Sequence, residues 1–239
     1  MLSAAIASAA LALRADIIYQ TNPPYFGPNG PPAFDIMDFQ SVALRFTPRR
    51  DFTLETVRVW IMSNDLTQPP QAPIRLEVRD ANPDGRPGEF IIASTSFHAT
   101  AIGWNPVLET VPIRAHPLLR AHTDYWLILH CDLHVNTPAW NWSDGSIGII
   151  ALSHGGQTNF TEGGEGAVTG TTIEGSPACY TNCDGSTATP VLSANDFVCF
   201  LNKFASADPY ANCDGSTGSP LLTANDFQCF INRFVTGCP

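Results

Sequence analysis

Basic residues are scarce in this sequence. Its 239 residues include 12 Lys and Arg against 22 Asp and Glu, which gives a formal net charge of −10 at pH 7. A nucleic-acid-binding surface needs positive charge to neutralise phosphate groups, so this balance argues against nucleic acid as a partner. The acidic balance suits a protein that stays soluble outside the cell.

The sequence also lacks the local motifs that mark common enzyme sites. It contains no Gly-x-Ser-x-Gly elbow, no phosphate-binding loop and no dinucleotide fingerprint. It has no CxxC pair and no histidine after His154, which disfavours a zinc site in the C-terminal region. We therefore expect a non-catalytic protein. A small extracellular hydrolase stays an alternative, because the separation of two catalytic carboxylates is a property of the fold.

Apolar runs long enough to span a bilayer are missing as well. Residues 2–13, LSAAIASAALAL, are apolar, but this stretch is shorter than the span of about 20 residues that a membrane helix needs. We interpret residues 1–15 as a signal peptide, with Ala12 or Ala15 before the cleavage site. Basic residues do not precede this core, and a buried N-terminal strand or helix is the alternative. The mature protein is therefore expected to be secreted or held at the cell surface, without a transmembrane segment.

An internal repeat lies near the C-terminus. Residues 180–205 and 210–235 are identical at 17 of 26 positions. In the first copy, Ser193 stands three residues before Asp196, a helix-start pattern similar to a capping box, and the second copy repeats it with Thr and Asp. The apolar residues that follow in the first copy have the spacing of one helix face: Phe197, Phe200, Leu201 and Phe204. Oxygen-bearing side chains crowd the turn before each predicted helix, so each copy predicts an ion-binding loop followed by a helix.

This pattern resembles the type I dockerin, a duplicated loop–helix module of secreted bacterial proteins, and is most similar to its cysteine-containing variant. The similarity covers about residues 179–238, and we take residues 179–239 as the C-terminal module. It implies that calcium is held by loop positions one, three, five and twelve. These positions fall on Asn182, Asp184, Ser186 and Asp196 in the first copy and on Asn212, Asp214, Ser216 and Asp226 in the second.

Two departures from the dockerin pattern bear on calcium. Three extra residues, around Ala188–Pro190 and Gly218–Pro220, lengthen each loop, and each site keeps only two carboxylates. The number of ligand charges tunes calcium affinity over several decades, so fewer carboxylates mean weaker binding. The alternative is a turn that holds no ion and is kept in shape by disulfides.

The dockerin resemblance also implies a protein partner, such as a cohesin-like receptor or a cell-surface component. A duplicated module presents the same surface twice, so it can engage a receptor in two orientations. The expected partner-binding residues are Asn195, Asn202, Lys203, Asn225, Asn232 and Arg233. The alternative is that duplication only completes a stable unit, because one loop and one helix bury too little surface alone.

Six of the seven cysteines lie in the last quarter of the chain, which predicts a disulfide framework. Fifteen pairings of six cysteines exist, but the repeat symmetry favours one loop-to-helix bridge in each copy and a clasp around both copies. The predicted bridges are Cys183–Cys199, Cys213–Cys229 and Cys179–Cys238. Such cross-links suit a small unit with little core and indicate an oxidising compartment. The remaining Cys131 is expected to be a buried small apolar residue.

Residues 16–154 are predicted to form an antiparallel β-sandwich or jelly roll. Short runs alternate between apolar and polar residues, as half-buried strands do, without a convincing helix. These runs are residues 56–62, 73–79, 91–97, 124–130 and 147–152. The Gly- and Thr-rich residues 155–178 are expected to be a linker to the C-terminal module.

Two stretches of this region are similar to the bacterial β-sandwich domains called choice-of-anchor domains. Residues 79–88 read RDANPDGRPG and residues 123–129 read TDYWLIL. Those domains sit on variable C-terminal anchors, and they have no established catalytic residues to carry over. The resemblance implies an exported display or binding domain whose ligand is unknown.

Two polar clusters in this region have the spacing of metal ligands. They are Asp80, Asn82 and Asp84, and His130, Asp132 and His134. We interpret the first cluster as a hairpin corner, because Pro and Gly within it favour a turn. The second is interpreted as polar residues on one strand face, with a metal site as the alternative.

Tryptophans give the region its second functional alternative, a carbohydrate-binding module. Trp140 and Trp142 alternate on one predicted strand, while Trp60 and Trp104 lie elsewhere. Exposed aromatic rings could stack on sugars, and buried rings would instead fill the core. We favour the core interpretation.

Overall fold

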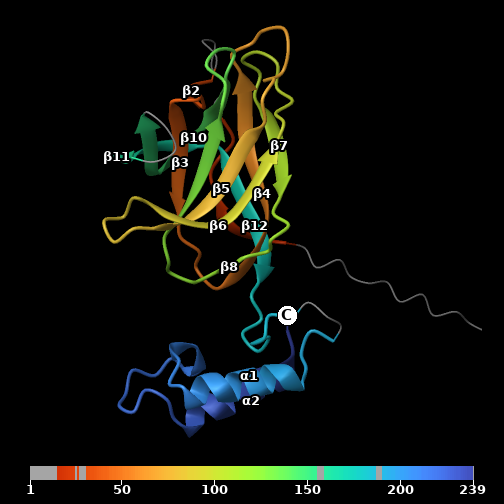
Figure 1. Cartoon of the computed structure of the whole chain (residues 1–239), viewed down its shortest axis with the longest axis vertical. Coiled ribbons are helices and arrows are strands. Elements are labelled where there is room, and N and C mark those ends of the chain that lie inside the picture. The colour runs from red at the N-terminus through yellow and green to blue at the C-terminus, as the bar shows by residue number, and fades with distance from the viewer. Residues whose placement is uncertain (1–14, 25, 27–30, 155–158, 187–189, 239) are drawn as a thin grey trace, which may run out of the picture. The chain divides into compact units, whose positions relative to one another are not determined.

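The computed structural model describes residues 15–24, 26, 31–154, 159–186 and 190–238. The chain divides into two compact units, Met1–Pro177 and Ala178–Pro239. The first unit is built of strands, and both described α-helices belong to the second (Figure 1). Of the predicted signal peptide, residues 1–15, only Ala15 lies within the described residues. In the described part of the chain, no helix is long and apolar enough to cross a membrane.

The first unit is mainly antiparallel β-structure, which confirms that part of the fold prediction. The strands are β1 (Asp16–Gln20), β2 (Ala33–Asp35), β3 (Gln40–Phe46), β4 (Phe52–Ser63), β5 (Ile74–Ala81), β6 (Pro87–Phe97), β7 (Val107–Pro112), β8 (Leu118–Leu119), β9 (Tyr125–Cys131), β10 (Pro138–His154), β11 (Phe160–Thr169) and β12 (Thr171–Pro177). All pairings of these strands are antiparallel.

Strand β10 takes part in two layers. Residues 138–141 at its start pair with β2 and β4, and residues 150–154 at its end pair with β3. The first layer continues through β4 to β12, β1, β7 and β8, and the second continues through β3 to β9, β5 and β6, with β11 on the other side of β10. This arrangement is consistent with a β-sandwich (Figure 1).

The main apolar core is made of inward-facing residues from strands of both layers. These residues are fully buried: Leu54, Val57, Val59 and Ile173 come from the first layer, and Val42, Leu44, Leu76, Val78, Leu127 and Leu129 come from the second. Side chains alternate between the two faces of a strand, so the predicted period-2 runs place six of these residues on the inner faces: Val57, Val59, Leu76, Val78, Leu127 and Leu129. Each fully buried aliphatic side chain contributes about 1.5–3 kcal/mol to stability.

The predicted linker, residues 155–178, differs from the structure because most of it forms β11 and β12. Strand β12 pairs with β4 on one side and β1 on the other, and its Ile173 is fully buried. Glycine here serves close packing rather than flexibility: an added Cβ on Gly175 would lie 2.1 Å from the Thr53 carbonyl oxygen. Only a residue without a side chain fits at such a backbone approach. The β-rich unit therefore extends beyond residue 154 to Pro177.

The second unit contains helices α1 (Ala194–Ala205) and α2 (Ala224–Thr236), with a short 3-10 helix, η1 (Pro209–Ala211), between them. Both predicted capping boxes are present, at Ser193 with Asp196 and at the matching residues of the second copy. The helices meet through the buried rings of Phe200 and Phe230, whose centroids are 4.1 Å apart.

The three predicted disulfides are confirmed. They join Cys183 to Cys199, Cys213 to Cys229, and Cys179 to Cys238. The repeat symmetry extends to two tyrosines, Tyr180 and Tyr210, whose rings stack 4.9 Å apart and whose hydroxyls each donate to the backbone carbonyl of the other. Cys131 is a buried free cysteine, as expected.

Candidate functional sites

Each repeat forms a turn that is closed by its own polar groups. In the first copy, Asn182 Nδ2 donates to the Ser186 carbonyl oxygen at 2.9 Å, and the Ser186 N–H donates to Asp184 Oδ1 at 2.8 Å. The second copy makes the same two bonds at 2.8 and 2.9 Å. The structure therefore brings the first three predicted calcium ligands of each copy into one turn.

The fourth predicted ligand of each copy is a fully buried carboxylate. Asp196 Oδ1 accepts the Asp184 N–H at 3.1 Å and Oδ2 accepts the Ser193 N–H at 2.8 Å, so this side chain ties the turn to the start of α1. Asp226 makes the equivalent bonds at the start of α2 at the same distances. Each carboxylate thus lies against the turn that carries the other predicted ligands.

The electrostatics of these two carboxyls are set by burial and by the backbone. Burial alone would raise their pKa, but the backbone N–H groups that donate to them outweigh it, and the pKa of both Asp196 and Asp226 lies below its ordinary value. Both are therefore negatively charged at neutral pH. Within the described residues, no basic side chain forms an ion pair with either.

One amide oxygen in each turn has no hydrogen-bond partner. Asn182 Oδ1 and Asn212 Oδ1 are shielded from solvent, and neither finds a donor within the described chain. Leaving a buried oxygen unpaired costs about 1–3 kcal/mol, so the same defect in both copies points to a missing partner. An amide oxygen in a turn that also holds carboxylates suits a hard cation such as calcium. Among the described residues no three His, Cys, Asp or Glu side chains gather, in keeping with only two carboxylates per turn.

The predicted partner-binding residues lie on the two helices. Four exposed asparagines are among them: Asn195, Asn202, Asn225 and Asn232. Lys203 is half-buried; its Nζ lies 3.1 Å from Asp208 Oδ2 and 4.9 Å from the centre of the Tyr210 ring. Arg233 lies over the Tyr180 ring, with Cζ 5.1 Å from the ring centre. The two basic residues therefore occupy equivalent places in the repeat.

The turn at residues 80–84 has the geometry of a hairpin corner. The Asn82 N–H donates to the Arg86 carbonyl at 2.8 Å, and the Gly85 N–H donates to the Asn82 carbonyl at the same distance. Gly85 has a φ of +83°, a conformation that glycine adopts without strain. These bonds account for the turn of the Asx-Pro-Asp-Gly pattern, while Asp80 Oδ1 is buried without a hydrogen-bond partner.

The histidine cluster is not brought together. Strand β9 ends at Cys131, so Asp132 and His134 leave the strand face that carries His130. His134 is exposed and lies 3.3 Å from the Asp38 carboxylate, whereas His130 is buried. The prediction of a common strand face for these three residues was therefore wrong, because the strand stops one residue after the first of them.

His130 instead belongs to a buried polar network on the outer face of the second layer. Ser41 Oγ lies 2.5 Å from His130 Nδ1, and His130 Nε2 lies 3.4 Å from Glu77 Oε2. Arg79 donates to the same oxygen from Nε at 2.7 Å. Serine, histidine and glutamate are the residue types of a hydrolase triad, but Ser41 is only 3% exposed. A nucleophile needs access to its substrate, so this network gives no support to the hydrolase alternative.

The tryptophan pair does not form an exposed platform. Trp140 is fully buried in the core, and Trp142 is half-buried with its ring 5.3 Å from that of Phe34. Trp104 is exposed and Trp60 is half-buried. The core interpretation therefore holds for Trp140, and the pair offers no flat face for a sugar.

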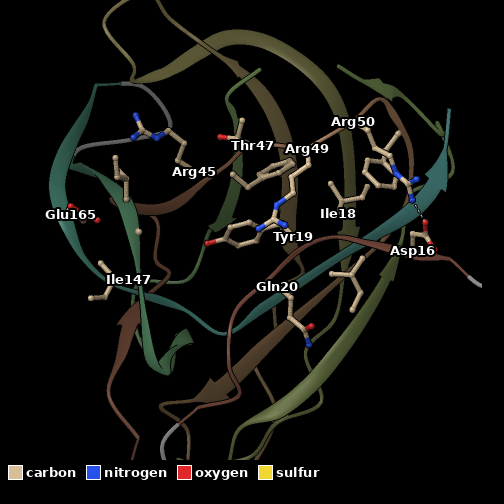
Figure 2. A pocket seen from close by; sticks show the side chains of 15 residues that line it. Asp16, Ile18, Tyr19, Gln20, Arg45, Thr47, Arg49, Arg50, Ile147 and Glu165 are labelled. Atoms are coloured by element: carbon tan, nitrogen blue, oxygen red, sulfur yellow. Dashed lines mark hydrogen bonds and ion pairs between the residues drawn. The ribbon is translucent and has the colours of Figure 1, made fainter. Parts of the chain in front are cut away.

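A cavity of about 1000 Å³ opens between β1 and the second layer, and the sequence did not point to it (Figure 2). Its walls come from β1, from residues 45–52 at the end of β3 and the start of β4, from residues 147–149 of β10 and from Glu165 of β11. The charged residues of its lining are Asp16, Arg45, Arg49, Arg50 and Glu165. Four separate chain segments build this site, and the adjacent Arg49 and Arg50 are the one local signal that could have marked it.

Comparisons with known proteins identify no relatives by sequence. No family model matches the chain, and no curated protein matches it. Among solved structures, a family two carbohydrate esterase from Cellvibrio japonicus is similar over 62% of this chain, at 7% sequence identity and a TM-score of 0.25. The matched region spans about a third of that protein, 34% of its length. A likeness at this TM-score carries no argument about fold or activity.

Proposed function

We propose that this protein is a secreted or cell-surface, non-catalytic protein with two roles divided between its two units. The β-rich unit binds or displays a ligand. The C-terminal unit acts as a dockerin-like anchor, which binds calcium at its two turns and docks onto a protein receptor. The three disulfides and the lack of a membrane-spanning helix among the described residues fit an extracellular protein.

The observation that carries the calcium proposal is the matching pair of unpaired amide oxygens, Asn182 Oδ1 and Asn212 Oδ1, in turns whose backbone also binds the buried carboxylates of Asp196 and Asp226. A carboxylate has about four lone-pair sites, so each Asp retains acceptor capacity after accepting backbone N–H groups. Calcium would complete the partners of both the amide and the carboxylate oxygens. Two carboxylates per site fit the weak affinities of extracellular calcium modules, with a Kd of about 10⁻⁴–10⁻³ M.

The docking proposal rests on the two-fold repetition of the helical surfaces. The residues offered by α1 are Asn195, Asn202 and Lys203, and α2 offers Asn225, Asn232 and Arg233 at equivalent positions. Alanine substitution of one triple should leave most binding to a cohesin-like receptor, and substitution of both should abolish it. Loss of all binding from one triple alone would contradict docking through either copy.

The calcium proposal is tested on the full chain, because its two units have separate optical signals. All five tryptophans lie in the β-rich unit, so their fluorescence follows that unit, while helical circular dichroism follows the C-terminal unit. Ten millimolar calcium should stabilise the helical transition by about 1–3 kcal/mol for each site, because ligand binding to the folded state alone raises stability. The tryptophan transition should not move.

Matched variants connect this effect to the turns. Asn182→Ala combined with Asn212→Ala should remove the calcium-dependent shift. Asn202→Ala combined with Asn232→Ala, which alters exposed helix residues outside the turns, should retain it. A helical midpoint that is the same in calcium and in chelator would reject the calcium proposal and leave a turn held by disulfides alone.

A further inference from the structure

The cavity in Figure 2 concentrates basic side chains in an acidic protein. Three of the chain's 12 Lys and Arg residues line it, although the formal net charge of the whole chain is −10. Asp16 and Glu165 are the two acidic residues of the lining, so its formal charge is positive. A locally positive site in an acidic protein attracts anions, and it favours anionic ligands over neutral or cationic ones.

The three arginines differ in how their charges are already used. Arg50 forms an ion pair with Asp16 and lies over the Phe52 ring, with Cζ 5.0 Å from its centre. Arg45 Nε lies 4.0 Å from the Asp124 carboxylate. Arg49 is exposed, and among the described residues it has neither an ion pair nor a hydrogen bond. Its guanidinium is therefore the charge that remains available to a ligand.

Figure 2 shows how these groups are distributed around the cavity. Arg49 and Tyr19 occupy the middle of the view, Arg45 and Glu165 lie toward one side, and the Arg50–Asp16 pair lies on the other. The planar guanidinium of arginine presents paired N–H donors that match the oxygens of a carboxylate, sulfate or phosphate group.

Tyr19 supplies a second donor. Strand β1 has a register shift against β12 between Ile17 and Tyr19, so the strict alternation of its side chains is broken at the cavity. Burial raises the pKa of the Tyr19 phenol, which therefore stays protonated and can donate a hydrogen bond to an anion. Gly148 lies near this hydroxyl: an added Cβ there would lie 3.7 Å from it and 2.9 Å from Val168 Cγ1.

Apart from two uncharged polar residues, Gln20 and Thr47, the remainder of the lining is apolar and aromatic. Ile18, Phe46 and Phe52 of the core also border the cavity, and the Tyr19 and Phe46 ring centroids are 6.1 Å apart. Ligand pockets commonly combine such an apolar lining with a few convergent polar groups, in volumes of about 300–1,000 Å³. The cavity thus has space for the body of an organic molecule as well as for its charged group.

We propose that this cavity binds a small organic anion, whose carboxylate, sulfate or phosphate group pairs with Arg49 and accepts a hydrogen bond from Tyr19. The inference rests on the proposed ligand-binding role of the β-rich unit, and it assigns the chemical class of that ligand. Calcium binding and docking by the C-terminal unit do not enter it.

The test uses isothermal titration calorimetry of the full chain with pairs of probe molecules that differ in charge. Trigalacturonate is compared with its fully methyl-esterified form, and benzoate with benzyl alcohol, while inorganic sulfate and phosphate are titrated separately. At least one organic anion should bind, its neutral counterpart should bind at least about tenfold more weakly, and its affinity should fall as salt is raised. The member that binds identifies whether an acidic sugar or a simple aromatic acid is preferred.

Variants assign the binding to the cavity. Arg49→Gln should lower the affinity for the anion at least about tenfold, and Tyr19→Phe should lower it by a smaller factor, because each variant loses a hydrogen bond to a charged group. Arg49→Lys keeps the positive charge but not the planar guanidinium, so its loss of affinity should be smaller than that of Arg49→Gln. The control is Arg114→Gln, which removes the same charge from an exposed residue that does not line the cavity. Arg49 is itself exposed, so its variants should keep the tryptophan-reported stability of the parent.

Three results would overturn the inference: no organic anion binds, the neutral counterparts bind equally well, or Arg49→Gln and Arg114→Gln weaken binding alike. Binding of inorganic sulfate or phosphate alone would also overturn it, because the ligand would then not be organic. Each of these results leaves the calcium-dependent helical transition unaffected, so this inference and the proposed anchor can fail separately.

Discussion

Replacing Glu77 with glutamine should destabilise the β-rich unit by about 3 kcal/mol at neutral pH. Glu77 is 3% exposed, and its carboxylate is surrounded by partners: Arg79 Nη2 at 2.5 Å, Arg75 Nε at 3.2 Å and His130 Nε2 at 3.4 Å. Glutamine has nearly the same shape but removes the negative charge. The variant leaves the buried Arg79 guanidinium without its counterion, which typically costs 3–5 kcal/mol.

The pKa of Glu77 gives a second way to obtain the stability lost in Glu77→Gln. Burial would raise this pKa, but His130 and Arg79 outweigh it and lower the pKa from 4.5 to about 2. A carboxyl with this difference contributes roughly 3 kcal/mol above pH 4.5, at about 1.4 kcal/mol for each pH unit. Because the folded pKa is depressed, the contribution is complete above the unfolded pKa and is lost as pH falls through about 2. The difference between parent and variant should therefore have declined to about half or less at pH 3.

Urea unfolding followed by tryptophan fluorescence measures this difference, since all five tryptophans lie in the β-rich unit. The matched control is Glu89→Gln, which neutralises an exposed glutamate of β6 and should change stability by less than about 0.5 kcal/mol. A Glu77→Gln effect no larger than that of the control would refute the buried ion-pair argument. An effect that stays constant from pH 7 to pH 3 would refute its electrostatic origin.

Two further predictions concern backbone packing and cross-linking. Gly175→Ala should destabilise the tryptophan-reported transition by about 1–3 kcal/mol, because its Cβ would meet the Thr53 carbonyl oxygen. Gly166→Ala is the control and should not destabilise it, because no atom lies within 4 Å of its added Cβ. Equal effects of the two substitutions would argue against the close approach. Removing the clasp with Cys179→Ser and Cys238→Ser should lower the helical stability by about 4 kcal/mol, and removing Cys183–Cys199 by about 3 kcal/mol, because the bridges span 59 and 16 residues. Thermal circular dichroism under oxidising conditions checks both values, and a larger loss from the shorter bridge would contradict the loop-length argument.

The C-terminal unit was the more predictable of the two, because its information is local and repeated. The capping boxes depend on residues three apart, and the repeat symmetry reduced fifteen disulfide pairings to the one observed. What its sequence did not reveal is the unpaired state of Asn182 Oδ1 and Asn212 Oδ1, since that depends on how each turn closes on its own backbone.

The β-rich unit was predictable in class but not in extent. Period-2 runs indicated strands correctly, yet residues 155–178 were taken for a linker on their Gly and Thr content. The close approach of Gly175 to Thr53 involves segments more than a hundred residues apart, and no local pattern records it. The cavity escaped prediction for the same reason, because Tyr19, Arg49 and Ile147 become neighbours only when separate strands assemble.

Alternation along β5 shows why a polar strand face need not be an exposed one. The sequence placed Ile74, Leu76 and Val78 on one face, and all three are fully buried in the core. Glu77 and Arg79 on the opposite face are buried as well, beside a smaller apolar cluster that includes Trp126 and Ile128 of β9. Periodicity determines which residues share a face, whereas burial depends on what covers that face. Charges that the fold encloses must neutralise one another, and this requirement explains why Glu77 meets Arg79 there.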